Sequence, residues 1–379
     1  MRFLSLFSGI EAATQAWEPF GWEPAAFAEI ESFPAAVLAH HYPNVPNLGD
    51  VTKYQEWPDI GTVDLICGGS PCQDYSIAGQ RLGMAGGRGQ LTLTYIEIAA
   101  WYRPRWLVYE NVPGILSSNG GRDFARFLGD LTGQTISVPE GGWKNSGIVA
   151  GIPDAFGLAW RVLDAQHVRT RRFPFAVPQR RRRVWVVGYL GDWRRAAAVL
   201  FDRESLSGNP APRRETRQVA APTLSARTRG GGGLGTDFDC DGGLISAFGG
   251  GRTSGPIDAA ACLTAKGQRI DFEIETFVAH TLKGEGFDAS EDGTGRGTPL
   301  VPAAACPPHL ATPWAVRRLT AEECEALQGF PREFTRIPYR GKPASACPDG
   351  PRYKALGNSW AVNCAELIGE RIVAVEDME

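Results

Sequence analysis

Cys72 stands in the segment "GGSPCQDYS" (68–76), directly after a proline and beyond the apolar run "VDLIC" (63–67). A cysteine sulfur can pack in a core, form a disulfide, bind a metal or act as a nucleophile. The chain has eight cysteines without a CxxC pair and only five histidines, a pattern that argues against a zinc site or a disulfide framework. Most of these thiols, Cys67 among them, are expected to be small buried residues, so a role for Cys72 must be argued from its surroundings.

A carboxyl group follows at the end of the next strand-like run, "RWLVYENV" (105–112), where Glu110 lies 38 residues after Cys72. Neighbouring strands of a parallel sheet would bring the two side chains to the same edge. A thiolate can form a covalent intermediate, and a carboxylic acid can protonate or hydrogen-bond the group that becomes electron rich. This pair is suited to the chemistry of an electron-poor heterocycle.

A basic segment, "RTRRFPFAVPQRRRR" (169–183), carries seven arginines and no carboxylate. The net charge of −3 gives no global sign of nucleic-acid binding, but 33 of the 39 basic residues are arginine. Arginine suits the planar, bidentate recognition of phosphate or guanine. A solvated charged surface is the alternative, and it is disfavoured because the apolar run "VWVVGYL" (184–190) follows at once.

These groups need a scaffold, and the first half of the chain alternates β-rich runs with helical patterns. Strands are expected at 2–9, 24–30, 63–69, 105–112, 160–165 and 183–190, and helices at 32–41, 91–103 and 122–131. This alternation predicts an α/β fold with a doubly wound, mostly parallel sheet covered on both faces. Ligands of such sheets bind beyond the carboxyl ends of the strands.

Three features that follow the first strands fit the binding of an adenosine group. The turn "LFSGIEAA" (6–13) holds a glycine after the first strand, Glu29 ends the second, and "GDV" (49–51) places Asp50 just before an expected third strand. Each acid taken singly is more typical of a helix cap or a solvated carboxylate than of a ligand-binding residue. The ordered set favours a nucleotide-like ligand.

The composition changes near residue 192. Glycine-rich stretches and few apolar runs extend to about residue 315, which predicts a second, smaller, loop-rich domain of short strands, with a flexible linker as the alternative. Helical patterns return at 319–330 and at 359–376, the latter after the turn-like "LGN". The expected division is 1–191 for a catalytic and cofactor-binding domain, 192–315 for the second domain, and 316–379 for a returning segment that completes both.

The ordered blocks of the chain resemble those of the cytosine-5 DNA methyltransferases that use S-adenosylmethionine. Nine blocks carry the resemblance, and they span nearly the whole chain outside 192–315: "LFSGIEAATQAWE", "FAEIESFPAAVL", "GDVT", "GGSPCQDYS", "GGRGQLTLTYIEIA", "YENV", "PQRRRRVWVVG", "RRLTAEECEALQGFP" and "YKALGNSWAVNCAELIG". The resemblance implies a Rossmann-like methyltransferase fold, and it makes the second domain the target-recognition domain for a specific duplex DNA sequence.

The resemblance also implies a role for individual residues. Cys72 would attack carbon 6 of a cytosine flipped out of the duplex, while Glu110 engages ring nitrogen 3 and carbon 5 accepts the methyl group. Positive charge near Cys72 would lower its pKa. The catalytic residues implied are Cys72, Glu110, Arg181 and Arg183; those that bind the target are Pro71 and Gln179; those that bind S-adenosylmethionine are Phe7, Gly9, Ile10, Glu29, Asp50, Val51, Leu91 and Asn358.

One position departs from the family pattern, because Glu11 stands where many relatives have a second glycine. We expect it to be tolerated, since the methionine part of the cofactor has an amino group that an acid can meet; a weakened cofactor site is the alternative.

Composition limits the setting and the partners. No apolar run reaches the roughly 18 residues of a membrane helix, and the first residues are unlike a signal peptide, so we expect a cytoplasmic protein of a bacterial cell, encoded by host or phage. The expected partner is double-stranded DNA, with no membrane and no metal. A monomer is expected, and the sequence leaves three alternatives open: a partnership with a cognate restriction endonuclease, protection of a phage genome, or an enzyme that acts alone.

Three other functions fit parts of the sequence. A methyltransferase acting on tRNA would share the catalytic blocks, although the long insertion favours DNA. A catalytically silent DNA-binding relative is disfavoured by the presence of Cys72, Glu110 and the Gln-x-Arg-x-Arg block. A nicotinamide-dependent oxidoreductase would use a similar sheet, but the chain lacks the full GxGxxG turn after its first strand.

Overall fold

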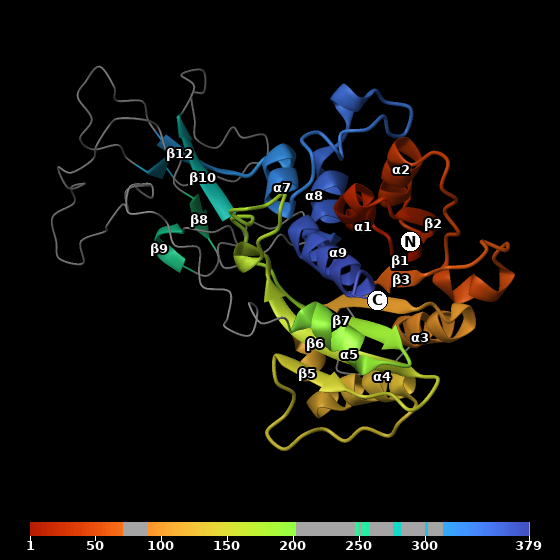
Figure 1. The fold of residues 1–379 in the computed structure, drawn as a ribbon. Helices are drawn as coiled ribbons and strands as arrows, with labels where there is room; N and C mark the ends of the chain where they lie inside the picture. Colours follow the sequence, from red (N-terminus) through yellow and green to blue (C-terminus); the bar gives the residue numbers. More distant parts are fainter. Residues whose placement is uncertain are drawn as a thin grey trace.

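The computed structural model describes residues 1–70, 90–201, 247–249, 252–257, 276–281, 300–301 and 314–378 (Figure 1). Its centre is a seven-stranded sheet in the order β2-β1-β3-β4-β7-β6-β5. The first four strands in that order are parallel, and the pairs β4–β7, β7–β6 and β6–β5 are antiparallel, so that five of the seven strands run in one direction. The strands are β1 (Arg2–Leu6), β2 (Glu23–Ala28), β3 (Leu65–Gly68), β4 (Trp106–Asn111), β5 (Ser146–Val149), β6 (Phe156–Asp164) and β7 (Arg182–Leu190).

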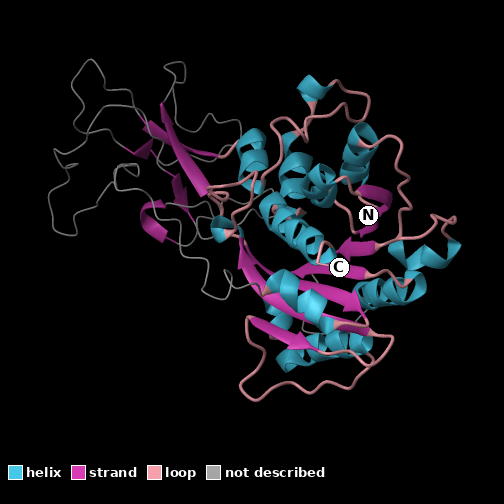
Figure 2. Ribbon diagram, viewed as in Figure 1, coloured by secondary structure: helices cyan, strands magenta, loops and turns pink. Residues whose placement is uncertain are grey.

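Helices cover both faces of this sheet (Figure 2). Alternate strand residues, such as Trp106 and Val108 against Leu107 and Tyr109, enter two separate cores. One core is shared with α1 (Ala12–Trp17), α2 (Ser32–His41), α5 (Trp193–Leu200) and α9 (Val362–Glu376), and the other with α3 (Gln90–Tyr102) and α4 (Arg122–Thr132). The predicted doubly wound α/β fold is confirmed.

The C-terminal residues return to this first unit. α7 (Ala321–Gln328) begins with a capping box formed by Thr320 and Glu323 and ends at Gly329 in the left-handed region. α8 (Asp349–Asn358) follows, and α9 then packs beside α1, where Trp17 Nε1 donates to the carbonyl of Ala365 at 2.8 Å. Residues more than 340 positions apart thus share one core.

Short antiparallel strands form a second sheet, which lies to the left of the first in Figure 1. This agrees with the smaller domain of short strands predicted from the glycine-rich composition. Its order is β11-β12-β10-β8-β9, from β8 (Ala247–Gly249), β9 (Arg252–Ile257), β10 (Thr276–Thr281), β11 (Leu300–Val301) and β12 (Trp314–Arg318).

Several local predictions were wrong. No third strand follows Asp50, because Val51–Glu56 form a 3-10 helix. Among the described residues, β2 pairs with β1 and, outside the named strands, makes the single bridge between Phe27 and Asn47. The "LGN" stretch is the last turn of α8 rather than a turn before a helix that starts at residue 359. β5, α1, α5 and α8 were not predicted, and α5 packs on the first sheet although it lies beyond residue 191.

Candidate active site

Glu110 is a buried carboxylate on the face of β4 that is turned toward α9. Trp185 on β7 lies directly opposite it, and Arg183, two residues earlier on the same face, places its Nε 3.0 Å from Glu110 Oε1. Burial raises the pKa of the Glu110 carboxyl above its usual range, and the charges of Arg183 and Arg181 oppose part of that rise. Glu110 therefore holds a proton more readily than an exposed glutamate does.

Arg181 is also buried, and its hydrogen bonds join separate parts of the backbone. Its N–H donates to Asp164 Oδ1 at 2.9 Å, and its Nη2 donates to the carbonyls of Gly357, at 3.2 Å, and Ser359. The start of β7 is thereby tied to the junction of α8 and α9. Of the two predicted catalytic arginines, Arg183 pairs with Glu110, whereas Arg181 joins the elements around it.

Gln179 has no exposed surface, and neither its Oε1 nor its Nε2 has a hydrogen-bond partner within the described ranges. A buried amide left without a partner costs about 1–3 kcal/mol for each polar group. It lies two residues before Arg181, in the position for which the resemblance implies contact with the target.

The strand that leads toward the predicted nucleophile ends against Glu110. A Cβ on Gly69 would lie 2.6 Å from the Glu110 carbonyl oxygen and 3.3 Å from its Oε2, so only glycine fits there. Pro71 and Cys72 themselves lie outside the described residues. The predicted meeting of the two strand ends is confirmed as far as Gly69 and Glu110, and the position of Cys72 stays a prediction.

Ser70 anchors the chain immediately before Pro71. Its buried Oγ lies 2.9 Å from Thr92 Oγ1 and 2.7 Å from the Tyr109 hydroxyl, and Asn111 Nδ2 lies within 3.4 Å of both Ser70 oxygens. This network joins the ends of β3 and β4 to the first turn of α3. No sequence pattern indicated it, because serine, threonine and tyrosine are common at exposed positions too.

Glu29 stands at the carboxyl end of β2, next to the turn after β1. Gly9, at φ 55°, donates its N–H to Glu29 Oε2 at 2.8 Å, and the Glu31 N–H donates to Oε1. Burial raises the pKa of Glu29. Because Gly9 can hold this positive φ at little cost, its backbone approaches the carboxylate closely.

Asn47 brings Asp50 to the same edge. Its Oδ1 accepts from the N–H groups of Glu29 and Gly49, and its Nδ2 donates to the Glu29 carbonyl at 3.0 Å. Hydrogen bonds from Thr52 lower the pKa of the Asp50 carboxyl, which therefore stays charged. Ile30, which no sequence pattern singled out, follows Glu29 with 73% of its side chain exposed, an apolar surface beside two carboxylates.

The other residues implied for the cofactor differ in how far they are exposed. The side chains of Ile10 and Val51 are buried in the two cores, so only their backbone can face a ligand. Phe7 is half-buried at φ 53°, Leu91 is half-buried in the first turn of α3, and Asn358 is exposed at the end of α8.

Glu11 differs from the expectation of a carboxylate that meets the cofactor. Only 1% of the residue is exposed; it accepts from Ser5 Oγ at 2.8 Å and from the N–H and hydroxyl of Thr14, and so caps α1. Burial raises its pKa to about 7. The Glu11 side chain points into the protein, and its hydrogen bonds to Ser5 and Thr14 stabilise the turn after β1 from the buried side.

In the part of the chain that the structure describes, no helix is both long and apolar enough to span a bilayer, and no three His, Cys, Asp or Glu side chains gather as metal ligands would.

Comparison with known proteins assigns the family. The family model for C-5 cytosine-specific DNA methylases matches residues 1–221 and 273–374. A relative from Escherichia phage P1, named a DNA N-6-adenine-methyltransferase, is 34% identical over 97% of this chain and 60% of its own length. The orphan methyltransferase M.SPRI of Bacillus phage SPR is 30% identical over 51% of this chain and 38% of its own length. The chain thus spans less than two thirds of these relatives.

Solved structures of low sequence identity share the fold. The Entamoeba histolytica methyltransferase EhMeth superposes with a TM-score of 0.56 at 14% identity, over 100% of this chain and 99% of that one. The Dnmt2 methyltransferase of S. pombe gives 0.55 at 13% identity, over 99% of each chain. The family match covers most of the chain, and the chain belongs to the C-5 cytosine-specific DNA methylase family.

Proposed function

We propose that this member of the C-5 cytosine-specific DNA methylase family transfers a methyl group from S-adenosylmethionine to carbon 5 of a cytosine in duplex DNA, through a covalent bond to Cys72. The observation that carries the proposal is the buried ion pair of Glu110 and Arg183 against Gly69, three residues before Cys72. An acid of raised pKa beside the approach to a cysteine is what addition to a pyrimidine ring requires.

In the proposed reaction, the Cys72 thiolate forms a bond to carbon 6 while Glu110 donates a hydrogen bond or its proton at ring nitrogen 3. The ring electrons move to carbon 5, which takes the methyl group. A base from solvent then takes the carbon 5 proton, the electron pair restores the double bond between carbons 5 and 6, and the Cys72 thiolate leaves. The proton on ring nitrogen 3 returns to Glu110. Arg183 holds the Glu110 carboxyl in place and offsets its charge once the proton has left.

The edge formed by Gly9, Glu29 and Asp50 fits S-adenosylmethionine, the donor that membership of this family implies. The Glu29 carboxylate can accept from ribose hydroxyls, Asp50 from an adenine amino group, and Ile30 offers an apolar surface to a flat base. The bound cofactor supplies an electrophilic methyl group on a sulfonium sulfur. Gln179 and Pro71 are proposed to contact the target nucleotide.

Duplex DNA is proposed over tRNA because a sheet of five short strands is inserted between α5 and α7, where a reader of the target sequence would lie. We propose that the second domain begins after α5, since that helix packs on the first sheet, and that it ends near residue 315 as predicted. A base in a duplex must leave the stack, at a cost of a few kcal/mol, to reach Glu110.

The name of the phage P1 relative favours a second candidate, transfer to the exocyclic nitrogen of adenine. About two fifths of that protein lies outside the match, so its named activity need not belong to the matched part. Transfer to an exocyclic amine requires no covalent bond to a ring carbon. It therefore gives Cys72 and Glu110 no role in the reaction. Cytosine is therefore the proposed substrate.

Expression in cells without their own DNA methylation tests the proposal. The DNA is digested to nucleosides and analysed by mass spectrometry for 5-methylcytosine and N6-methyladenine, and conversion sequencing gives the flanking bases. We expect 5-methylcytosine in one sequence context with the unaltered protein and with Cys347→Ser, a half-buried cysteine near α8, and none with Cys72→Ser. N6-methyladenine alone, or methylation of tRNA alone, would contradict the proposal.

A further inference from the structure

Trp360 joins the wall of the site from the far end of the sequence. It lies in the short connection between α8 and α9, is half-buried, and packs edge to face on Trp185 with ring centroids 4.9 Å apart. Trp185 is the residue directly opposite Glu110 on β7. The indole ring therefore stands over the same face of the sheet that carries Glu110 and Arg183.

The ring also reaches the end of β3. A Cβ built on Gly69 would lie 3.4 Å from Trp360 Nε1 and 3.3 Å from Glu110 Oε2, so the two atoms are within about 7 Å of each other. Within the described ranges, no hydrogen bond from Trp360 Nε1 to another residue is found. Gly69 thus lies between the indole N–H of Trp360 and the Glu110 carboxyl, which is proposed to bind ring nitrogen 3 of the target cytosine.

The backbone on either side of the indole is fixed. Arg181 donates to the carbonyls of Gly357 and Ser359, and Ser359 Oγ donates to the carbonyl of Trp360 at 3.3 Å. Arg181 itself is buried and held by Asp164. The α8–α9 connection is therefore tied to the strand that carries Arg183, and the indole has little freedom to move away.

We propose that Trp360 is a contact residue for the target base: its indole forms one wall of the pocket that receives the flipped cytosine and holds the ring against Glu110. This inference rests on the proposed function. A flat aromatic wall suits a flat pyrimidine, because aromatic side chains stack on bases and limit their orientation. Asn358, which the resemblance implies for the cofactor, lies two residues before Trp360, so the test has to measure the KM for both DNA and S-adenosylmethionine.

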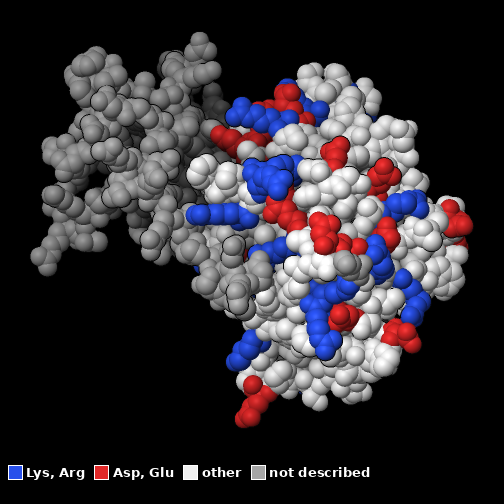
Figure 3. Space-filling model, in the orientation of Figure 1, with Lys and Arg blue, Asp and Glu red and all other residues white. Residues whose placement is uncertain are grey.

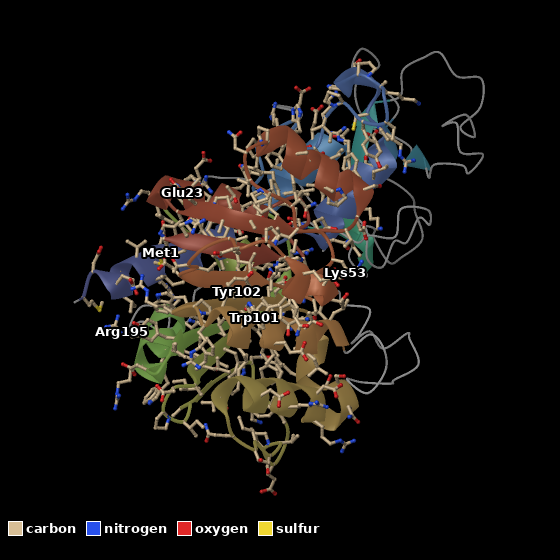
Figure 4. The ribbon with its side chains drawn as sticks, turned by 90° about the vertical axis from the view of Figure 1, so that its right-hand side faces the viewer. Met1, Glu23, Lys53, Trp101, Tyr102 and Arg195 are labelled. Atoms are coloured by element: carbon tan, nitrogen blue, oxygen red, sulfur yellow. The ribbon has the colours of Figure 1, made fainter. Side chains whose placement is uncertain are left out.

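The test compares Trp360→Ala and Trp360→Phe with Trp101→Phe. Trp101 (Figure 4) is a 60% exposed tryptophan near the end of α3 that lies farther from Ser70. Its ring contacts Tyr54. Each variant is assayed for kcat and KM toward plasmid DNA, for KM toward S-adenosylmethionine, and for the rate of covalent trapping on DNA that contains 5-fluorocytosine. Thermal unfolding shows whether the variants are folded.

Trp360→Ala should lower kcat/KM for DNA and the trapping rate by about 10- to 100-fold, the range expected when a base loses its aromatic stacking partner. Trp360→Phe should keep most of both, and the KM for S-adenosylmethionine should stay within about twofold of the original value in all variants. If Trp360→Ala does not fold, an unchanged trapping rate in Trp360→Leu would decide against the proposal.

Two results would overturn the inference. One is an unchanged trapping rate in folded Trp360→Ala, and the other is a loss confined to the KM for S-adenosylmethionine, which would assign the indole to the cofactor. Either result leaves the proposed function standing if the unaltered protein makes 5-methylcytosine. Failure of the unaltered protein to do so would instead remove the proposed function.

Discussion

At the scale of single residues, the proposed chemistry depends on Glu110. Its carboxyl lies in a buried position that favours the protonated form, and Arg183 at 3.0 Å favours the charged form. A carboxyl whose pKa is raised can give a proton to a ring nitrogen and later recover it. An exposed glutamate at the same edge would be fully ionised at neutral pH and could only accept.

Glu110→Gln tests this role. The amide can still donate a hydrogen bond but cannot transfer a proton, so kcat should fall by about 100-fold or more. In the unaltered protein, kcat should decline on the alkaline side as the protonated form is lost above the raised pKa. That alkaline decline should be absent in Glu110→Gln. Glu23→Gln, an exposed change at the start of β2 (Figure 4), should leave the pH profile unchanged; a Glu110→Gln enzyme with the original profile would exclude the role.

At the scale of elements, the site is assembled where strand ends meet. β3 ends at Gly68, and Ser70, two residues later, lies in a buried polar network with Thr92, Tyr109 and Asn111. β7 begins at the arginine block, which contacts both Glu110 and the α8–α9 connection. The end of β3, the first turn of α3, the start of β7 and the α8–α9 connection thus fix the surroundings of the Glu110 carboxyl.

Ser70→Ala should weaken this assembly. It removes a buried hydrogen-bond partner from Thr92, Tyr109 and Asn111, although Tyr109 and Asn111 keep the bond between them, and the free energy of unfolding should fall by about 1–3 kcal/mol. Methyl transfer should slow as well, because Cys72 is two residues away. Urea denaturation measures the first effect, with Ser117→Ala, an exposed serine that donates to the Gly114 carbonyl, as the control. Equal stability of the two variants would show that the network does not hold the strand end.

The N-cap of α1 provides a test by pH. Glu11 has a pKa raised to about 7 by burial, from 4.5, so the folded state binds a proton more tightly than the unfolded chain. The stability it contributes is full below about pH 4.5 and is lost as the pH rises through about 7, by at most about 3 kcal/mol. Glu11→Gln cannot ionise, and its stability relative to the unaltered protein should rise between pH 5 and 8 in urea denaturation. A difference that is constant across this interval would contradict the raised pKa.

The features that depend on local patterns could be predicted from the sequence. Apolar runs indicated the positions of β1, β2, β4 and β7, and the helical periodicity indicated α2, α3 and α4 to within a residue. The 3-10 helix after Asp50 was missed because an Asp that caps a helix and an Asp that precedes a strand look alike. The indole of Trp360 beside Gly69 was missed because nearly 300 residues separate them, and only packing brings them together.

At the scale of the whole molecule, basic and acidic side chains are interspersed over the visible face of the described residues, in keeping with the net charge of −3 (Figure 3). The proposed binding to DNA would therefore depend on local groups. Four exposed arginines lie in the turn that precedes β7 or at the start of that strand, and within the described ranges none forms an ion pair: Arg169, Arg171, Arg180 and Arg182. This turn leads directly to Arg183 and Glu110.

We expect these arginines to contact DNA phosphates. Arg169→Ala combined with Arg171→Ala should weaken DNA binding and reduce the slope of log K against log salt by up to about 2, roughly 0.9 for each phosphate that an arginine no longer neutralises. The matched control is Arg122→Ala with Arg126→Ala on α4, two exposed arginines that contact Asn119 and Asp130. Fluorescence anisotropy at several salt concentrations gives the slopes; identical slopes for the two double variants would place the DNA elsewhere.

The most direct test of the central claim is the mass of the protein after reaction with duplex DNA that contains 5-fluorocytosine, in the presence of S-adenosylmethionine. Fluorine at carbon 5 prevents the proton loss that releases the enzyme, so the bond between sulfur and carbon 6 should persist. Covalent catalysis by Cys72 predicts a stable adduct, one methyl group heavier than protein plus DNA, that maps to Cys72 and is absent in Cys72→Ser. Methyl transfer to cytosine without any adduct, or an adduct on another residue, would contradict it.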